Sequence, residues 1–200
     1  FEERLEDYDI VEPFSALYKP HKTLTISGGL RVQHSPAGNV PYDVKLLYSG
    51  AAVWNFYEPM YLKVNFATGF RPPVFNSTSA NSAGGNYAGD PDLKSEESRA
   101  IKAAFIAHLV KNKKRIRQWT LRLNYSYTEL FNMIRMISGR YFNASKRGIH
   151  AAELNTDVYL RGGHRLVLSY TYIMMQGDSW LDLGIFRAVP NLWLAAGAVF

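Results

Sequence analysis

The sequence predicts an all-β fold, and more specifically an antiparallel transmembrane β-barrel. Apolar and polar residues alternate along about nine runs, as in strands that have one apolar and one polar face. These runs approach the length of about 9–11 residues that a membrane strand needs. Short turns and longer loops alternate along the chain, an asymmetry that is typical of outer-membrane barrels and not of soluble β-sandwiches.

The expected strands follow one another with consistent alternation. The clearest has Leu24, Ile26 and Leu30 on one side, with threonine, serine and arginine on the other. In chain order, the expected strands are Tyr8–Tyr18, Leu24–Val32, Tyr42–Tyr48, Met60–Phe66, Ser95–Val110, Trp119–Tyr127, Leu154–Leu160, Leu166–Met174 and Leu192–Phe200. Short turns are expected near Lys19, Lys111 and Arg161, and longer loops near Ser35, Phe70, Asn132 and Gly177.

Three stretches are less regular than these runs. Between Gly50 and Pro59 the sequence predicts a connection, although an unusually apolar one. Ser95–Val110 alternates as a strand would, but its alanines and the spacing of its large apolar residues also fit a helix. Leu130–Ile137 is expected to form a short helical turn within a loop.

The stretch from Tyr61 to Leu93 carries the most specific pattern in the chain. Its alternating strand ends in FRPP, where Pro72 and Pro73 remove two backbone donors, so that no strand ladder can continue. A run rich in Asn, Ser, Gly and Ala then leads to GDPDLKSEES, where alternation resumes. A loop of this length usually marks a functional site or a disordered segment.

These motifs resemble the barrel of TonB-dependent outer-membrane receptors. FRPP, the long polar loop and GDPDLKSEES occur in the family's order. TLTISGGLRVQHS at Thr23–Ser35 and YFNASKRGIHAAELN at Tyr141–Asn155 are similar to two further segments of the family. RLVLSYTY at Arg165–Tyr172 and VPNLWLAAGAVF at Val189–Phe200 fit the hairpin that follows. The resemblance covers nearly the whole chain, and it implies that Ser95–Val110 is a strand.

The resemblance implies a transport receptor. The family imports siderophores, cobalamin, haem or oligosaccharides across the outer membrane of Gram-negative bacteria, through a plugged barrel of about twenty-two strands. Nine strands are an odd and incomplete set. Residues 1–200 are therefore expected to be an internal part of such a barrel without its plug, and TonB is expected to act through that plug. A fragment with two unpaired edges is not expected to fold alone.

The loop between FRPP and DPDL is the expected ligand-binding region. Four residues offer donors or an aromatic face to an iron chelate, cobalamin or sugar, namely Arg71, Asn76, Asn86 and Tyr87. A mobile outer loop that makes no specific contact is an equal alternative. Haem receptors of this family carry a histidine in this loop, and the stretch from Val74 to Ala88 has none, which counts against haem.

Composition is compatible with a membrane barrel without requiring it. The mean hydropathy of -0.19 and the aromatic content of 14% would also suit a soluble β-sandwich. The alternative function is accordingly a small self-contained barrel or a soluble β-sandwich that acts as a binding module. Cysteine is absent, which leaves no disulfide framework or thiolate metal site. The start FEERLEDYDI is not a signal peptide, so a mature or truncated chain is expected.

The net charge of +6 has its densest source in the run Lys111–Arg117. A solvated turn is favoured there over a nucleic-acid site, so no nucleic-acid partner is expected. Cations at a bilayer surface would also attract anionic lipid headgroups. Five further cations are expected to face the barrel interior and to steer an anionic ligand or contact a plug, namely Arg31, Lys45, Lys63, Lys102 and Arg122.

Residues with catalytic or metal-binding patterns are sparse. The five histidines show no ligand spacing, and Glu96 and Glu97 point to opposite faces of a strand. No G-x-S-x-G or phosphate-loop motif occurs. The sequence therefore predicts a protein that is not an enzyme, with no catalytic residues, metal site or cofactor.

Overall fold

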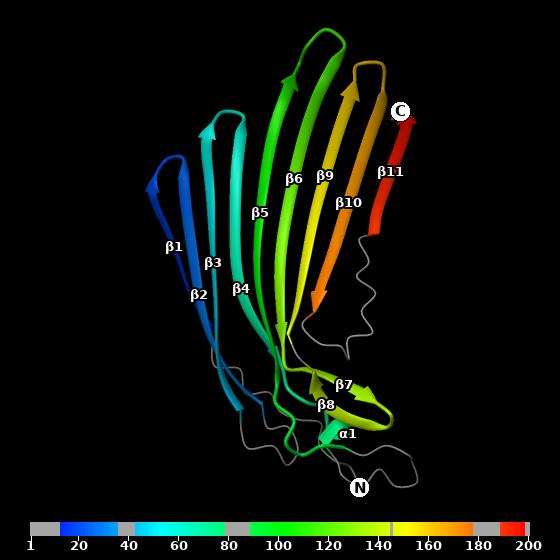
Figure 1. Ribbon diagram of the computed structural model, residues 1–200. Coiled ribbons are helices and arrows are strands. Elements are labelled where there is room, and N and C mark those ends of the chain that lie inside the picture. Colours follow the sequence, from blue (N-terminus) through cyan, green and yellow to red (C-terminus); the bar gives the residue numbers. More distant parts are fainter. Residues whose placement is uncertain (1–12, 36–42, 79–88, 145, 178–188, 199–200) are drawn as a thin grey trace, which may run out of the picture.

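The computed structural model describes residues 13–35, 43–78, 89–144, 146–177 and 189–198. Nine strands form one sheet (Figure 1): β1 Phe14–His21, β2 Leu24–Ser35, β3 Asp43–Tyr57, β4 Met60–Arg71, β5 Glu96–Lys111, β6 Ile116–Phe131, β9 Arg147–Leu160, β10 His164–Gly177 and β11 Val189–Ala198. A separate hairpin consists of β7 (Met133–Ile137) and β8 (Arg140–Ala144), and α1 is a single helical turn, Phe75–Thr78.

The large sheet is an antiparallel meander. Each strand pairs with its neighbours along the chain, except that β6 pairs with β9 because the β7–β8 hairpin is inserted between them. β1 and β11 lie at the two edges, and within the described ranges no strand joins one edge to the other. The predicted class, an incomplete antiparallel barrel, is confirmed as an open, curved sheet (Figure 1).

The strand register separates an apolar face from a polar face. On β6, Trp119, Leu121 and Leu123 pair with Val158, Thr156 and Leu154 of β9. The alternate residues of β6, Thr120 and Arg122, pair with aspartate and asparagine. Because side chains alternate along a strand, the first set lies on what we call the apolar face, and the second on the polar face.

Large side chains of the apolar face are exposed rather than buried. Leu46, Leu123 and Leu166 retain 58%, 44% and 48% of their accessible surface. Among the side chains of the large sheet that the structure describes, which exclude those of β11, only Leu47 and Ala107 are buried apolar ones. The sheet therefore has no water-excluding core of its own, and its apolar face is suited to contact with an apolar environment.

The connections differ in length at the two ends of the sheet. Short turns join β1 to β2, β3 to β4, β5 to β6 and β9 to β10 at one end, the top of Figure 1. The longer connections, which join β2 to β3, β4 to β5, β6 to β9 and β10 to β11, leave from the opposite end. The predicted alternation of short turns and long loops is confirmed.

Two local predictions were wrong. The stretch from Gly50 is not a connection, because β3 continues to Tyr57 and turns back at Glu58 and Pro59. Its alternation is masked in the sequence, since Ala51 and Val53 are apolar residues on the polar face.

Leu130–Ile137 is not helical either. β6 continues to Phe131, and Met133–Ile137 then forms β7, which pairs with β8. The two-residue turn between them has positive φ angles of 51° at Ser138 and 80° at Gly139, as a tight hairpin turn requires.

The stretch that fitted both a strand and a helix is a strand. Ser95–Val110 corresponds to β5, which pairs with β4 and β6 along most of its length. Tyr8 and Ile10 of the first expected strand, and Phe200 of the last, lie outside the described residues. Among the described residues, no helix has both the length and the apolar character needed to span a membrane.

Candidate functional site

The two ends of the long β4–β5 connection are fixed against each other. After the two prolines, the Ser77 backbone N–H and hydroxyl both donate to the Val74 carbonyl, at 2.9 and 2.7 Å. The Asp90 N–H donates to the Ser77 carbonyl at 2.8 Å, and the Asp90 carboxylate accepts from the Asp92 N–H at 2.9 Å. The segment that follows FRPP therefore contacts the start of DPDL at the base of the loop.

This loop base contains the most deeply buried side chains of the described structure, apart from those of the sheet. Ser77, Leu93 and Ser95 retain only 1%, 2% and 4% of their accessible surface. Small polar side chains are buried there together with one leucine because the chain folds back on itself beside α1. The base is thus a compact platform from which residues 79–88 leave and to which they return.

The β7–β8 hairpin is attached to the same platform by two side chains. Asn143 donates to the carbonyls of Lys94 and Asn132, at 2.9 and 2.7 Å, and accepts from the Lys94 N–H at 2.7 Å. Glu96 accepts from the Ile134 N–H at 2.7 Å. We call Glu96 and Asn143 the hairpin anchor, since together they connect β7 and β8 to the start of β5.

Of the four expected ligand-binding residues, only Arg71 has a described side chain. It lies at the end of β4, is 70% exposed, and forms an ion pair with Glu96 at 2.5 Å. Asn76 lies in α1, where the structure describes its backbone but not its side chain, and Asn86 and Tyr87 lie outside the described residues. The structure therefore locates Arg71 beside the hairpin anchor, and ligand binding by all four residues stays a prediction.

The anchor itself was not predicted to have a role. In the sequence, Glu96 belongs to the GDPDLKSEES motif and Asn143 to the segment Tyr141–Asn155, and neither motif indicates a contact between them and the hairpin. The contacts that reveal their roles join residues 38 and 49 positions apart in the chain. Strand periodicity gives the face on which a residue lies, but it does not give contacts between distant segments.

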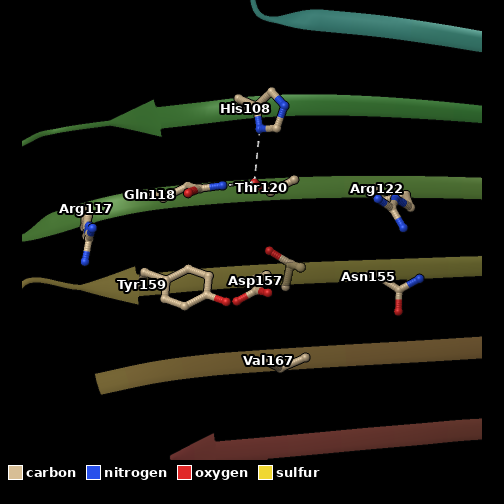
Figure 2. A pocket seen from close by; sticks show the side chains of 10 residues that line it. His108, Arg117, Gln118, Thr120, Arg122, Asn155, Asp157, Tyr159 and Val167 are labelled. Atoms are coloured by element: carbon tan, nitrogen blue, oxygen red, sulfur yellow. Dashed lines mark hydrogen bonds between the residues drawn. The ribbon is translucent and has the colours of Figure 1, made fainter. Parts of the chain in front are cut away.

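A groove of about 760 Å³ crosses the polar face nearer the short-turn end (Figure 2). It is lined by His108 of β5, by Arg117, Gln118, Thr120 and Arg122 of β6, by Asn155, Thr156, Asp157 and Tyr159 of β9, and by Val167 of β10. His108 and Gln118 both hydrogen bond to the Thr120 hydroxyl, at 3.2 Å each. Arg122, one of the cations expected to face the interior, lies among these polar groups (Figure 2).

Three histidines contact hydroxyl groups. His21 lies 2.9 Å from the Thr23 hydroxyl, and His150 lies 2.9 Å from the Tyr125 hydroxyl. His108 contacts Thr120 in the groove, as described above. In the part of the chain that the structure describes, no group of three or more His, Asp or Glu side chains is arranged to hold a metal ion.

Comparison with known proteins identifies the family to which this arrangement belongs. The family model described as "TonB dependent receptor-like, beta-barrel" matches residues 14–192, which covers most of the chain. No curated protein matches the sequence at a significant level. The match spans the whole meander up to β11 and includes the loop base and the hairpin anchor. The chain belongs to the TonB-dependent receptor-like β-barrel family.

Proposed function

We propose that this chain is part of the barrel of an outer-membrane receptor that imports a scarce ligand with energy supplied through TonB. The observation that carries the proposal is the exposed apolar face of an antiparallel meander, in a chain of this family. The family consists of transport receptors rather than enzymes, and we propose no catalytic activity for the chain.

The dimensions of the apolar face suit a bilayer. Trp119 and Tyr127 both lie on this face of β6, separated by Leu121, Leu123 and Tyr125. Eight residues at about 3.4 Å each span about 27 Å along a strand, or about 21 Å across a membrane for a tilt of about 40°. An outer-membrane barrel has an apolar band about 25 Å high between two aromatic girdles. Trp119 and Tyr127 are thus suitable girdle residues.

The proposal also assigns a direction to the sheet. Outer-membrane barrels have short turns at the periplasmic end and longer loops outside the cell. The turn between β5 and β6 would then face the periplasm, and the loop base and the hairpin anchor would lie outside. The polar face would line the lumen, where Lys63, Lys102 and Arg122 would attract an anionic ligand or contact a plug.

The family match assigns residues 14–192 to the barrel, and we propose that residues 1–200 as a whole belong to it. The plug, through which TonB would act, then lies elsewhere in the receptor. The free edges of β1 and β11 would pair with further strands, because an open sheet edge is not tolerated in lipid.

The ligand that we propose is an iron chelate, cobalamin or an oligosaccharide. The proposed contacts are Arg71, Asn76, Asn86 and Tyr87, on a loop whose base is fixed by the contacts between Ser77 and Asp90. A fixed base supports a binding role, because less conformational freedom is lost when the ligand binds. Haem is disfavoured, because no histidine occurs between Val74 and Ala88.

Tryptophan fluorescence tests the membrane location. When the intact receptor that contains this chain is inserted into vesicles, brominated lipids should quench Trp54 and Trp119, because both lie on the apolar face. The inserted form should also resist SDS at room temperature. A soluble, cooperatively folded monomer without quenching would overturn the proposal and favour the soluble β-sandwich binding module.

Binding measurements on the intact receptor in outer-membrane vesicles test the ligand site. A ferric catecholate chelate, cyanocobalamin and a maltooligosaccharide serve as probes. One of them should bind, and Tyr87→Ala should weaken its binding about tenfold, the scale expected for loss of an aromatic contact. Tyr61→Ala, which alters a tyrosine of β4 far from the loop, should leave affinity unchanged. Equal affinities of the wild type and Tyr87→Ala would exclude Tyr87 from the site.

A further inference from the structure

The β5–β6 hairpin carries the strongest concentration of positive charge in the chain. Between Ser98 and Thr128 there is no Asp or Glu, while there are eight cations: Arg99, Lys102, Lys111, Lys113, Lys114, Arg115, Arg117 and Arg122. Five of the eight fall within Lys111–Arg117, and Arg161 follows on the neighbouring β9–β10 turn. We call these last six residues the basic turn patch; all six side chains are exposed.

Backbone hydrogen bonds hold the patch together. Within the β5–β6 turn, the N–H groups of Asn112 and Lys113 donate to the carbonyls of Arg117 and Ile116, at 2.9 and 3.0 Å. The Arg161 N–H donates to the Arg115 carbonyl at 3.0 Å, which joins the two turns. Like charges that are fixed close together repel one another, and a bound anion relieves that repulsion.

A cleft lies between the two turns, and it shares Arg117 and Tyr159 with the groove of the polar face. Its volume is about 440 Å³, and its lining consists of Asn112, Arg117, Tyr159, Leu160, Arg161, Gly163 and His164. This lining includes two guanidinium groups and an amide as hydrogen-bond donors, and it includes no carboxylate. Guanidinium groups bind phosphate through paired, charge-assisted hydrogen bonds.

The position of the patch along the strand matches the depth of lipid headgroups. Arg117 precedes the girdle residue Trp119 by two positions, and Arg115 precedes it by four. At about 3.4 Å per residue and the same tilt of about 40°, Arg117 lies about 5 Å beyond Trp119 in depth, and Arg115, which precedes β6, lies farther out. The headgroup layer on each side of the hydrocarbon core is about 5–8 Å thick. The patch therefore begins in this layer at Arg117 and continues into the adjacent water.

We propose that the basic turn patch binds the phosphate groups of anionic phospholipids in the leaflet on the short-turn side of the membrane. The patch supplies six exposed cations, three of which, Arg115, Arg117 and Arg161, are guanidinium groups that can donate to phosphate oxygens. Zwitterionic lipids offer no net charge to the patch and are not enriched there. This inference rests on the proposed membrane location, and it adds the class of lipid and the residues that select it.

Brominated lipids test the proposal in the intact receptor that contains this chain, inserted into phosphatidylcholine vesicles. One variant retains only Trp119, with Trp54, Trp180, Trp193 and any tryptophan elsewhere in the receptor changed to Phe, and a matched variant retains only Trp54. Each is quenched by brominated phosphatidylglycerol or by brominated phosphatidylcholine at the same mole fraction. At Trp119, phosphatidylglycerol should quench about twofold more strongly than phosphatidylcholine, because the patch enriches it locally. At Trp54, the two lipids should quench equally.

Substitution of basic residues by glutamine provides a second test of the proposal. Lys113→Gln, Lys114→Gln and Arg115→Gln together should abolish the excess quenching at Trp119, whereas Lys19→Gln with Lys22→Gln on the β1–β2 turn should not. Equal quenching of Trp119 by both lipids, or excess quenching that survives the triple substitution, would overturn the proposed lipid binding. The proposed membrane location would be unaffected. If neither lipid quenches either tryptophan, the chain is not in the membrane, and the proposed function fails as well.

Discussion

Replacing Leu123 with arginine should prevent the chain from inserting stably into a bilayer. Leu123 lies midway between Trp119 and Tyr127 on the apolar face, is 44% exposed, and is paired with Phe105 and Leu154. A cation at the midplane of a membrane barrel costs about 2–4 kcal/mol. The yield of the SDS-resistant, brominated-lipid-quenched form should therefore fall about thirtyfold or more, since each 1.4 kcal/mol is a factor of ten.

Asn124→Arg is the matched control for this prediction. Asn124 is the next residue on β6, but its side chain lies on the polar face, paired with Ala104 and hydrogen bonded to Glu153 at 3.2 Å. An arginine there meets a carboxylate and water, so insertion should be nearly unchanged. If the two variants insert equally well, or fail equally, the assignment of the apolar face to lipid is wrong.

Replacing Asn143 with alanine should release the β7–β8 hairpin from the loop base. The change removes three hydrogen bonds, two to Lys94 and one to Asn132. At about 1 kcal/mol each, their loss lowers the free energy of local opening by about 2–3 kcal/mol. Trypsin cleavage after Arg135 and Arg140 should accelerate about 30- to 150-fold, while the large sheet stays intact. Mass spectrometry of the fragments over time measures this effect.

Asn124→Ala is the control for the second prediction, because that asparagine of β6 donates to Glu153 of β9 and not to the hairpin anchor. It should leave cleavage of the hairpin unchanged. Glu96→Gln separates the two functions of the anchor, since an amide oxygen still accepts from the Ile134 N–H while the ion pair with Arg71 is lost. Its cleavage rate should stay near that of the wild type. An Asn143→Ala chain as resistant as the wild type would show that the anchor does not hold the hairpin.

The large sheet could be predicted because one face of each strand is apolar and the other is polar. On β6, threonine, arginine and asparagine alternate with tryptophan and leucine, so both the strand and its faces follow from the order of residues. The same rule missed the last part of β3, where Ala51 and Val53 make both faces apolar. It also missed β7, because five residues are too few for a period to be recognised.

The candidate site could be predicted only as a region of the chain. The prolines of FRPP and the composition that follows them located the loop, and they brought Arg71 into consideration. The ion pair of Arg71 with Glu96, and the bonds of Asn143 to Lys94, depend on how β4, β5 and the inserted hairpin meet in space. Such contacts follow from tertiary structure, and no local pattern encodes them.

Because β6 pairs directly with β9, the segment that contains the β7–β8 hairpin can be replaced without changing that pairing. The pairs between β6 and β9 run from Leu130 with Arg147 to Ile116 with Leu160. The β7–β8 hairpin takes no part in this pairing. During evolution this segment can therefore be lengthened, shortened or replaced without a change in the large sheet, provided that the new segment contacts the start of β5. A designer who grafts a peptide epitope between Phe131 and Lys146 inherits the same freedom.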